Sequence, residues 1–419
     1  MKQLELWIRI ALVNLVIVAL LGLTLRGKMV FSMPFLDFKY ILHAHSHFAF
    51  GGWITLALLA LMTYRLLPVR LYEKPVYKWL LAGILVNAYG MLFSFPFQGY
   101  AFYSILFSTL FIFTTYGYAF VFTRDILKTQ VSGPVKLLAT GAVAYMALSS
   151  AGAFTLAYLL ATKSQNLLLY KDAIYTYLHL QYNGFFTLGV FALVLHYLQA
   201  ENRQALWFAR LLHIAVIPSM FMSYLWHYPD PVIRMIAVAG SLLIVLGTVW
   251  FFIMLRPVRP AFRALKPAAR PVAVIAMASF VLKMIFQALT IIPALGPLVF
   301  ANRPVIIGFL HLVLLGFVSL CLLAYFIQAG LLPYKKTAGF SLWLFIAGIL
   351  INEVVLFTQG LGFMLMMSSA LANWLLLAAA CCLFAGALLL AVSKWRRHHH
   401  AFQPESRQEL KAFRAFSRS

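Results

Sequence analysis

Twelve long apolar runs dominate the sequence, and each is long enough to cross a lipid bilayer. A membrane-spanning helix needs about 20 mostly apolar residues. With 63% hydrophobic and 10% charged residues, the chain has too little polar surface for a soluble domain of this length. The runs predict an all-α integral membrane protein with twelve transmembrane helices over residues 1–396, followed by a basic cytoplasmic tail, 397–419. The expected spans are 6–26, 38–67, 76–97, 100–124, 135–162, 170–199, 205–227, 231–255, 271–293, 303–330, 338–360 and 369–394.

The formal charge of +23 follows from where the basic residues lie. Lysines and arginines gather in the loops after even-numbered spans and are sparse after odd-numbered ones, apart from Arg26, Lys28 and Lys39. By the positive-inside rule, both termini face the cytoplasm, and the lipid bilayer rather than a nucleic acid is the expected partner. We expect a multi-pass protein of the cell inner membrane, with the first apolar run retained as a span.

Three histidines stand at alternate positions where the second span begins, in "YILHAHSHFAFGGW". On a helix, residues four apart share a face and residues two apart point in nearly opposite directions. His43 and His47 should therefore face one way and His45 the other. Spans 6 and 10 run in the same direction as span 2, and they place His179 and His311 at a similar depth, in the outer half of the bilayer.

Histidine inside a membrane is costly, so these side chains need partners. One reading is a hydrogen bond to a backbone carbonyl or a neighbouring helix. The other is metal chemistry, because neutral imidazole is a common axial ligand of haem iron, and two imidazoles from facing helices make a six-coordinate haem. The sequence has no CxxCH motif, so a covalently attached haem is not expected.

The histidine segments resemble motifs of the haem–copper oxidase subunit I superfamily, especially the cbb3-type oxidases and nitric oxide reductases. "HSHFAFGGW" in span 2 is similar to a His-x-His signature followed by glycine and tryptophan. "GFLHLVLLGF" in span 10 matches the low-spin-haem histidine at His311 and the glycine five residues later at Gly316. "YLHLQYNGFF" in span 6 resembles a metal-binding segment, with His179 at the ligand position and Asn183 in place of a glutamate.

The resemblance implies a haem b protein with one or two haems. His47 and His311 would be the axial ligands of a low-spin haem, and His45 would bind a second haem that faces His179. His43 and His227 are the remaining candidates to complete a copper or non-haem iron site with His179. An oxidoreductase of this kind would reduce oxygen or nitric oxide in a respiratory electron transport chain, with quinol or a separate cytochrome as electron donor.

The sequence also departs from the family pattern. No adjacent pair of histidines lies near span 7, and Phe309 replaces the first histidine of span 10. Either span 2 has taken over the missing role, or the two-metal centre is lost and the protein handles electrons or nitric oxide. An NnrS-type haem–copper membrane protein of nitric oxide metabolism is the alternative within this class.

Two further ionisable residues lie well inside spans, Lys283 and Glu353. Each must pair with another group or line water, because an isolated charge is poorly tolerated in lipid. They are proton-path candidates, and they also support a different class of function, a proton-coupled transporter. A structural lysine–glutamate contact explains them equally well, and a cofactor-free protein that acts as an assembly partner is a third hypothesis.

Overall fold

The computed structural model describes residues 2–228, 230–332, 336–364 and 370–400. Within these residues all regular elements are helical, and twelve spans are long and apolar enough to cross a membrane, which confirms the predicted fold class. The predicted basic tail lies outside the described residues from position 401 onward. The elements of the spans are, in chain order, α1 (Lys2–Val30); α2 (Phe38–Phe48), η1 (Ala49–Thr55) and α3 (Leu56–Leu66); α5 (Pro75–Gln98); α6 (Phe102–Ile126); α7 (Gly133–Ala161); α8 (Leu167–His179), η2 (Leu180–Phe186) and α9 (Thr187–Tyr197); α10 (Arg203–Met220) and η3 (Phe221–Ser223); α11 (Pro231–Arg263); α12 (Ala269–Leu289); α14 (Arg303–His311), η4 (Leu312–Ser319) and α15 (Leu320–Gln328); α16 (Lys336–Met364); and α17 (Ala370–His400).

Short connections separate the spans, and their residues explain where the helices begin and end. Proline is the first residue of α5 and of α11, where its fixed φ suits a helix start and its missing N–H costs nothing. Gly99 ends α5 at φ +58°, a conformation that favours glycine, and it packs on the ring of Tyr40. Two short helices that the apolar runs did not predict, α4 (Val69–Tyr72) and α13 (Leu295–Ala301), lie in connections.

The twelve spans form three units of four, and the helices of each unit pack on one another in the same order. In the first unit α1 packs along α2, η1 and α3, and α5 packs on α6. The second unit repeats this with α7 along α8, η2 and α9, and with α10 on α11. The third unit has α12 along η4 and α15, and α16 on α17.

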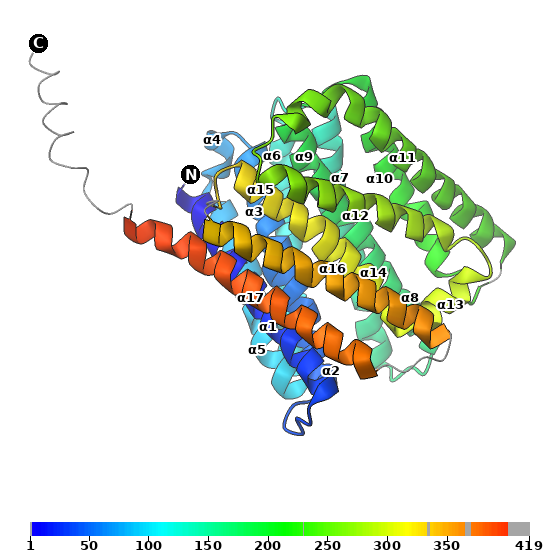
Figure 1. Cartoon of the computed structure of the whole chain (residues 1–419). Coiled ribbons are helices and arrows are strands. Elements are labelled where there is room, and N and C mark those ends of the chain that lie inside the picture. The colour runs from blue at the N-terminus through cyan, green and yellow to red at the C-terminus, as the bar shows by residue number, and fades with distance from the viewer. Residues whose placement is uncertain (1, 229, 333–335, 365–369, 401–419) are drawn as a thin grey trace, which may run out of the picture.

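The units join into a closed ring. The last span of each unit packs against the first span of the next, as α6 does on α7 and α11 on α12. The chain then closes on itself, because α17 packs along α1 (Figure 1). No unit is therefore at an end of the assembly.

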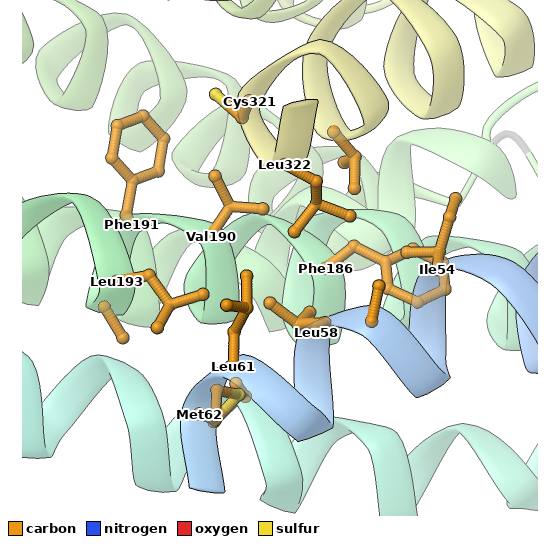
Figure 2. Close-up of a cluster of buried hydrophobic side chains, with 14 of the residues drawn as sticks. Ile54, Leu58, Leu61, Met62, Phe186, Val190, Phe191, Leu193, Cys321 and Leu322 are labelled. Carbon is orange, nitrogen blue, oxygen red and sulfur yellow. The ribbon is translucent and has the colours of Figure 1, made fainter. Parts of the chain in front are cut away.

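The second span of each unit forms the centre of the ring. Figure 2 shows side chains of α3 and α9, among them Leu58 and Val190, meeting Leu322 of α15 in one apolar cluster. A buried hydrogen bond from Trp53 Nε1 to Ser319 Oγ, 2.8 Å, ties span 2 directly to span 10. The indole N–H of a buried tryptophan needs a hydrogen-bond partner. Because both partners have fixed positions on their helices, this bond also sets how far span 2 and span 10 are shifted along each other.

Each central span contains a stretch of π-helix, η1, η2 or η4, that begins within two residues of a histidine. The three stretches carry the same short pattern, in which glycine follows the histidine by five residues and threonine or serine follows it by eight. The three copies of the pattern are separated by equal intervals of sequence. They are His47, Gly52 and Thr55; His179, Gly184 and Thr187; and His311, Gly316 and Ser319.

The glycines of this pattern let the first span of each unit approach the central span. A methyl group on Gly184 would lie 2.5 Å from Cβ of Tyr145 in α7, and one on Gly316 would lie 2.9 Å from Oγ of Ser279 in α12. In the first unit α1 comes close enough to η1 for Asn14 Nδ2 to donate a hydrogen bond to the backbone carbonyl of Gly52, at 2.6 Å. The local change of helix geometry and the small residue thus occur together in all three units.

Candidate functional site

His45 and His311 share a hydrogen-bond arrangement that leaves one ring nitrogen of each without a partner. Nδ1 of His45 is 3.1 Å from the carbonyl oxygen of Val18, and Nδ1 of His311 is 2.8 Å from that of Ile307. A carbonyl can only accept, so Nδ1 carries the proton in both rings and Nε2 keeps its lone pair. No hydrogen-bond partner for either Nε2 is found in the described part of the chain. This is the tautomer that a histidine uses to bind a metal through Nε2.

His45 lies on α2 beside α1, and His311 lies on α14 in the same part of the molecule. His45 and His311 are close enough to interact electrostatically, and both also feel the charge of Arg26 in α1. His45 packs on a backbone position without a side chain, because a methyl group on Gly22 would lie 3.2 Å from Cε1 of the His45 ring. Both histidine side chains remain partly exposed.

Two arginines stand near this pair of histidines. Arg26 interacts electrostatically with Arg303 at the start of α14, and the Arg303 guanidinium lies over the ring of Phe38, 5.7 Å from its centroid. In the described residues neither arginine forms an ion pair. The site therefore combines two imidazoles that each keep a free Nε2 with an excess of positive charge.

His43 and His47 face the opposite side of span 2, as the helical spacing predicts, and they contact α5 and the turn after it. The His47 ring stacks on Phe95 with centroids 4.6 Å apart, and its Nε2 is 2.8 Å from the hydroxyl of Tyr100. A tyrosine phenol ionises only at about pH 10, so Tyr100 keeps its proton near neutral pH and can donate it to Nε2 of His47. The His43 ring packs on the same tyrosine, at 4.6 Å between centroids.

His179 is buried in span 6 with both ring nitrogens engaged. Nε2 lies 2.8 Å from the carbonyl oxygen of Val216 and therefore donates to it, and Ser219 Oγ lies 3.2 Å from the same nitrogen. Nδ1 accepts from Nδ2 of Asn183 at 3.1 Å. Asn183, which stands where the related motif has a glutamate, thus holds the histidine in place by occupying the nitrogen that a metal would need.

His227 lies beyond the end of η3 and pairs with an acid, since its Nε2 is 3.0 Å from a carboxylate oxygen of Asp172. The structure therefore does not bring His43, His179 and His227 together, and His45 does not face His179. In the described ranges no group of three histidine, cysteine, aspartate or glutamate side chains converges as a metal site would require. These residues are anchored separately to α5, α10 and α8.

Lys283 and Glu353 do not form an ion pair in the described structure. Lys283 is fully buried in α12, where Nζ donates to the sulfur of Met284 at 3.8 Å, and it interacts electrostatically with His179. Glu353 in α16 accepts a hydrogen bond from Nδ2 of Asn352, 3.1 Å. The lysine–glutamate contact considered from the sequence is absent from the described ion pairs.

A cavity of about 530 Å³ lies between span 6, the end of span 7, and spans 9, 10 and 11. His179 and Phe309 both line it, and the Phe309 ring packs edge-on against Tyr182 with centroids 5.6 Å apart. Glu353 also lines it, whereas Lys283 does not. Phe309, which stands where the related motif has another histidine in span 10, therefore lines a cavity with its aromatic ring.

Sequence reasoning missed three features of the site: the complete threefold pattern, the pair Arg26 and Arg303, and the polar residue Gln287 in the cavity. The equal spacing of the three His-to-Gly patterns was a readable signal. The arginine pair had none, because two residues far apart in sequence meet only through the fold. No protein-family model matches this sequence, and no curated protein has significant sequence similarity to it.

Proposed function

We propose that the protein is a membrane haem b protein that transfers electrons, with His45 and His311 as the two axial ligands. One observation carries the proposal: each ring gives its Nδ1 proton to a backbone carbonyl and keeps Nε2 free, at neighbouring positions on two central spans. Haem-ligating and metal-ligating histidines are commonly oriented in this way by a backbone acceptor.

The residues present fit such a group. Gly22 gives α1 a close approach to His45, and both histidine side chains are partly exposed, so neither ring is fully enclosed by protein. Arg26 and Arg303 supply positive charge beside the pair, which suits the carboxylates of a haem. A haem with two imidazole ligands exchanges single electrons; the chain's own residues hold it, orient the ligand rings and neutralise its acidic groups.

His47 is a weaker candidate than His45 for the partner of His311. Its Nε2 is already within hydrogen-bond distance of Tyr100, and its ring stacks on Phe95, away from α1. The resemblance to haem–copper oxidases and nitric oxide reductases also supports haem b. The residues for a second metal do not converge, since both nitrogens of His179 are engaged and Phe309 lacks a ligand atom. We therefore favour electron or nitric oxide handling over oxygen reduction.

The test is a reduced-minus-oxidised visible spectrum of the purified protein, with His45→Ala, His311→Ala and His47→Ala measured in parallel. We expect a b-type spectrum of a six-coordinate haem, one haem per chain by pyridine haemochrome, and negligible oxygen uptake from a reduced donor. The spectrum should be lost in His45→Ala and His311→Ala and retained in His47→Ala. Loss in His47→Ala with retention in His45→Ala would instead establish the His47–His311 pairing, and a protein purified without haem would refute the proposal.

A further inference from the structure

The 530 Å³ cavity opens toward the lipid between α12 and α16. Four of its lining residues are also exposed on the outer surface of the bundle: Leu282, Leu289, Val354 and Phe357. The helices α12 and α16 lie on either side of span 10 and do not pack extensively on each other. Within the spans, that outer surface faces acyl chains, so a ligand can enter the cavity from the bilayer.

Two hydrogen-bond acceptors line the cavity, and one of them has no donor. Gln287 in α12 is 6% exposed and lines the cavity, and its Oε1 is buried without a hydrogen-bond partner. Glu353 lines the cavity from α16 and has only Asn352 as a hydrogen-bond donor. A buried acceptor without a donor costs free energy, which a ligand that brings a hydroxyl group would recover.

The charge and shape of the lining narrow the ligand class further. No lysine or arginine occurs among the described lining residues, so the headgroup of an anionic lipid finds no counter-charge there. Aromatic rings surround the space, including Tyr182 and Phe309, and the rings of Phe286 and Phe357 lie parallel near the mouth with centroids 6.3 Å apart. Such a lining suits a flat aromatic headgroup.

We propose that this cavity binds a lipid-soluble hydroquinone, with a phenolic hydroxyl donated to Gln287 Oε1 and the apolar tail leaving between α12 and α16. The proposal concerns binding alone and goes beyond the haem site. Because the cavity and the pair His45 and His311 use different residues, hydroquinone binding and haem binding can fail independently.

The experiment measures binding of reduced decylubiquinone to the full-length protein in lipid nanodiscs by anaerobic calorimetric titration. The oxidised form lacks the hydroxyl donors, and 1-decanol has a hydroxyl and a tail but no ring. Losing one hydrogen bond to a buried acceptor corresponds to about a five- to tenfold weaker Kd. We therefore expect the oxidised form and decanol to bind at least about fivefold more weakly than the reduced form. Equal binding of decanol or of the oxidised form would overturn the assignment to hydroquinone.

Two variants test the site itself. In Gln287→Leu the preference for the reduced form should disappear. Val354→Trp fills the mouth of the cavity from an exposed position and should weaken binding about tenfold or more. Leu350→Trp is the control, because Leu350 is also exposed to lipid one turn away but does not line the cavity, and it should leave binding unchanged. Equal affinities for the two tryptophan variants, or an unchanged preference in Gln287→Leu, would contradict the proposal. The same titration on His45→Ala separates this result from the presence of haem.

Discussion

At the residue scale, the ability of an imidazole to bind metal depends on which of its nitrogens the protein already uses. His179 has both nitrogens engaged, His47 has Nε2 near Tyr100, and His45 and His311 keep Nε2 free. The four histidines were predicted from the sequence to lie at similar depth. Their hydrogen bonds could not be predicted, because the acceptors for His45 and His179 are backbone carbonyl oxygens of other helices, those of Val18 and Val216. Any residue type at those positions would offer the same carbonyl.

The close approach of α1 to His45 gives a prediction about Gly22. A valine there would press on the His45 ring, since even a methyl group would lie 3.2 Å from its Cε1. We expect Gly22→Val to lower the haem content or change the low-spin spectrum while the chain remains folded in the membrane. Gly27→Val, on the same helix beside the flexible end of Met33, is the control. An unchanged spectrum in Gly22→Val would mean that the His45 ring is not held by this contact.

Lys283 is fully buried, and in the described structure it has no acidic partner. Replacing an unpaired buried ammonium with an apolar side chain of similar length removes a desolvation cost on the order of a few kcal/mol. We expect Lys283→Met to raise the thermal midpoint of the detergent-solubilised protein, whereas Lys128→Met at an exposed site leaves it unchanged. A lower midpoint would show that the lysine makes a stabilising interaction, and loss of electron transfer with a raised midpoint would support its role as a proton carrier.

At the scale of elements, the number and order of the twelve spans were predictable because lipid requires long apolar helices. Their ends were less so, since α11 continues to Arg263, eight residues past the predicted end of span 8. The facing of the central spans was only partly predictable. The opposite projection of His45 and His47 followed from helical spacing, but η1, η2 and η4 interrupt the 3.6-residue period. Residues before and after each π-helical stretch therefore do not share a face as they would in a regular α-helix. The sequence also did not indicate that His45 would contact α1 and not α5.

The glycine of each π-helical stretch sets how closely the first span of its unit can pack. Gly184→Ala places a methyl group 2.5 Å from Cβ of Tyr145, and overpacking of this kind typically costs about 1–3 kcal/mol. We expect a lower thermal midpoint for Gly184→Ala. Gly133→Ala, where no atom lies within 4 Å of the added methyl group, should change stability by less than about 0.5 kcal/mol. Similar midpoints for the two variants would show that α7 can move away from η2 at no cost.

At the scale of the whole molecule, the charge pattern predicts which loops face the cytoplasm, and the structure supplies exposed positions for a test. Glu73 lies after span 2 and Gln165 after span 5, and both side chains are exposed. In a variant without Cys321, Cys381 and Cys382, a membrane-impermeant maleimide added to intact cells should label Gln165→Cys and should label Glu73→Cys only after lysis. The reverse result would invert the predicted orientation.

The packing of α17 along α1 means that the order of the three units along the chain is not dictated by their arrangement in space. A ring of three similarly packed units can be opened between any two of them without changing which helices touch. A circular permutant that links the end of α17 to the start of α1, and opens the chain between α6 and α7, keeps every helix contact. We expect it to insert and fold, with the absorption spectrum of the parent chain. Such a result would show that the fold does not depend on the order in which its three four-helix units follow one another along the chain.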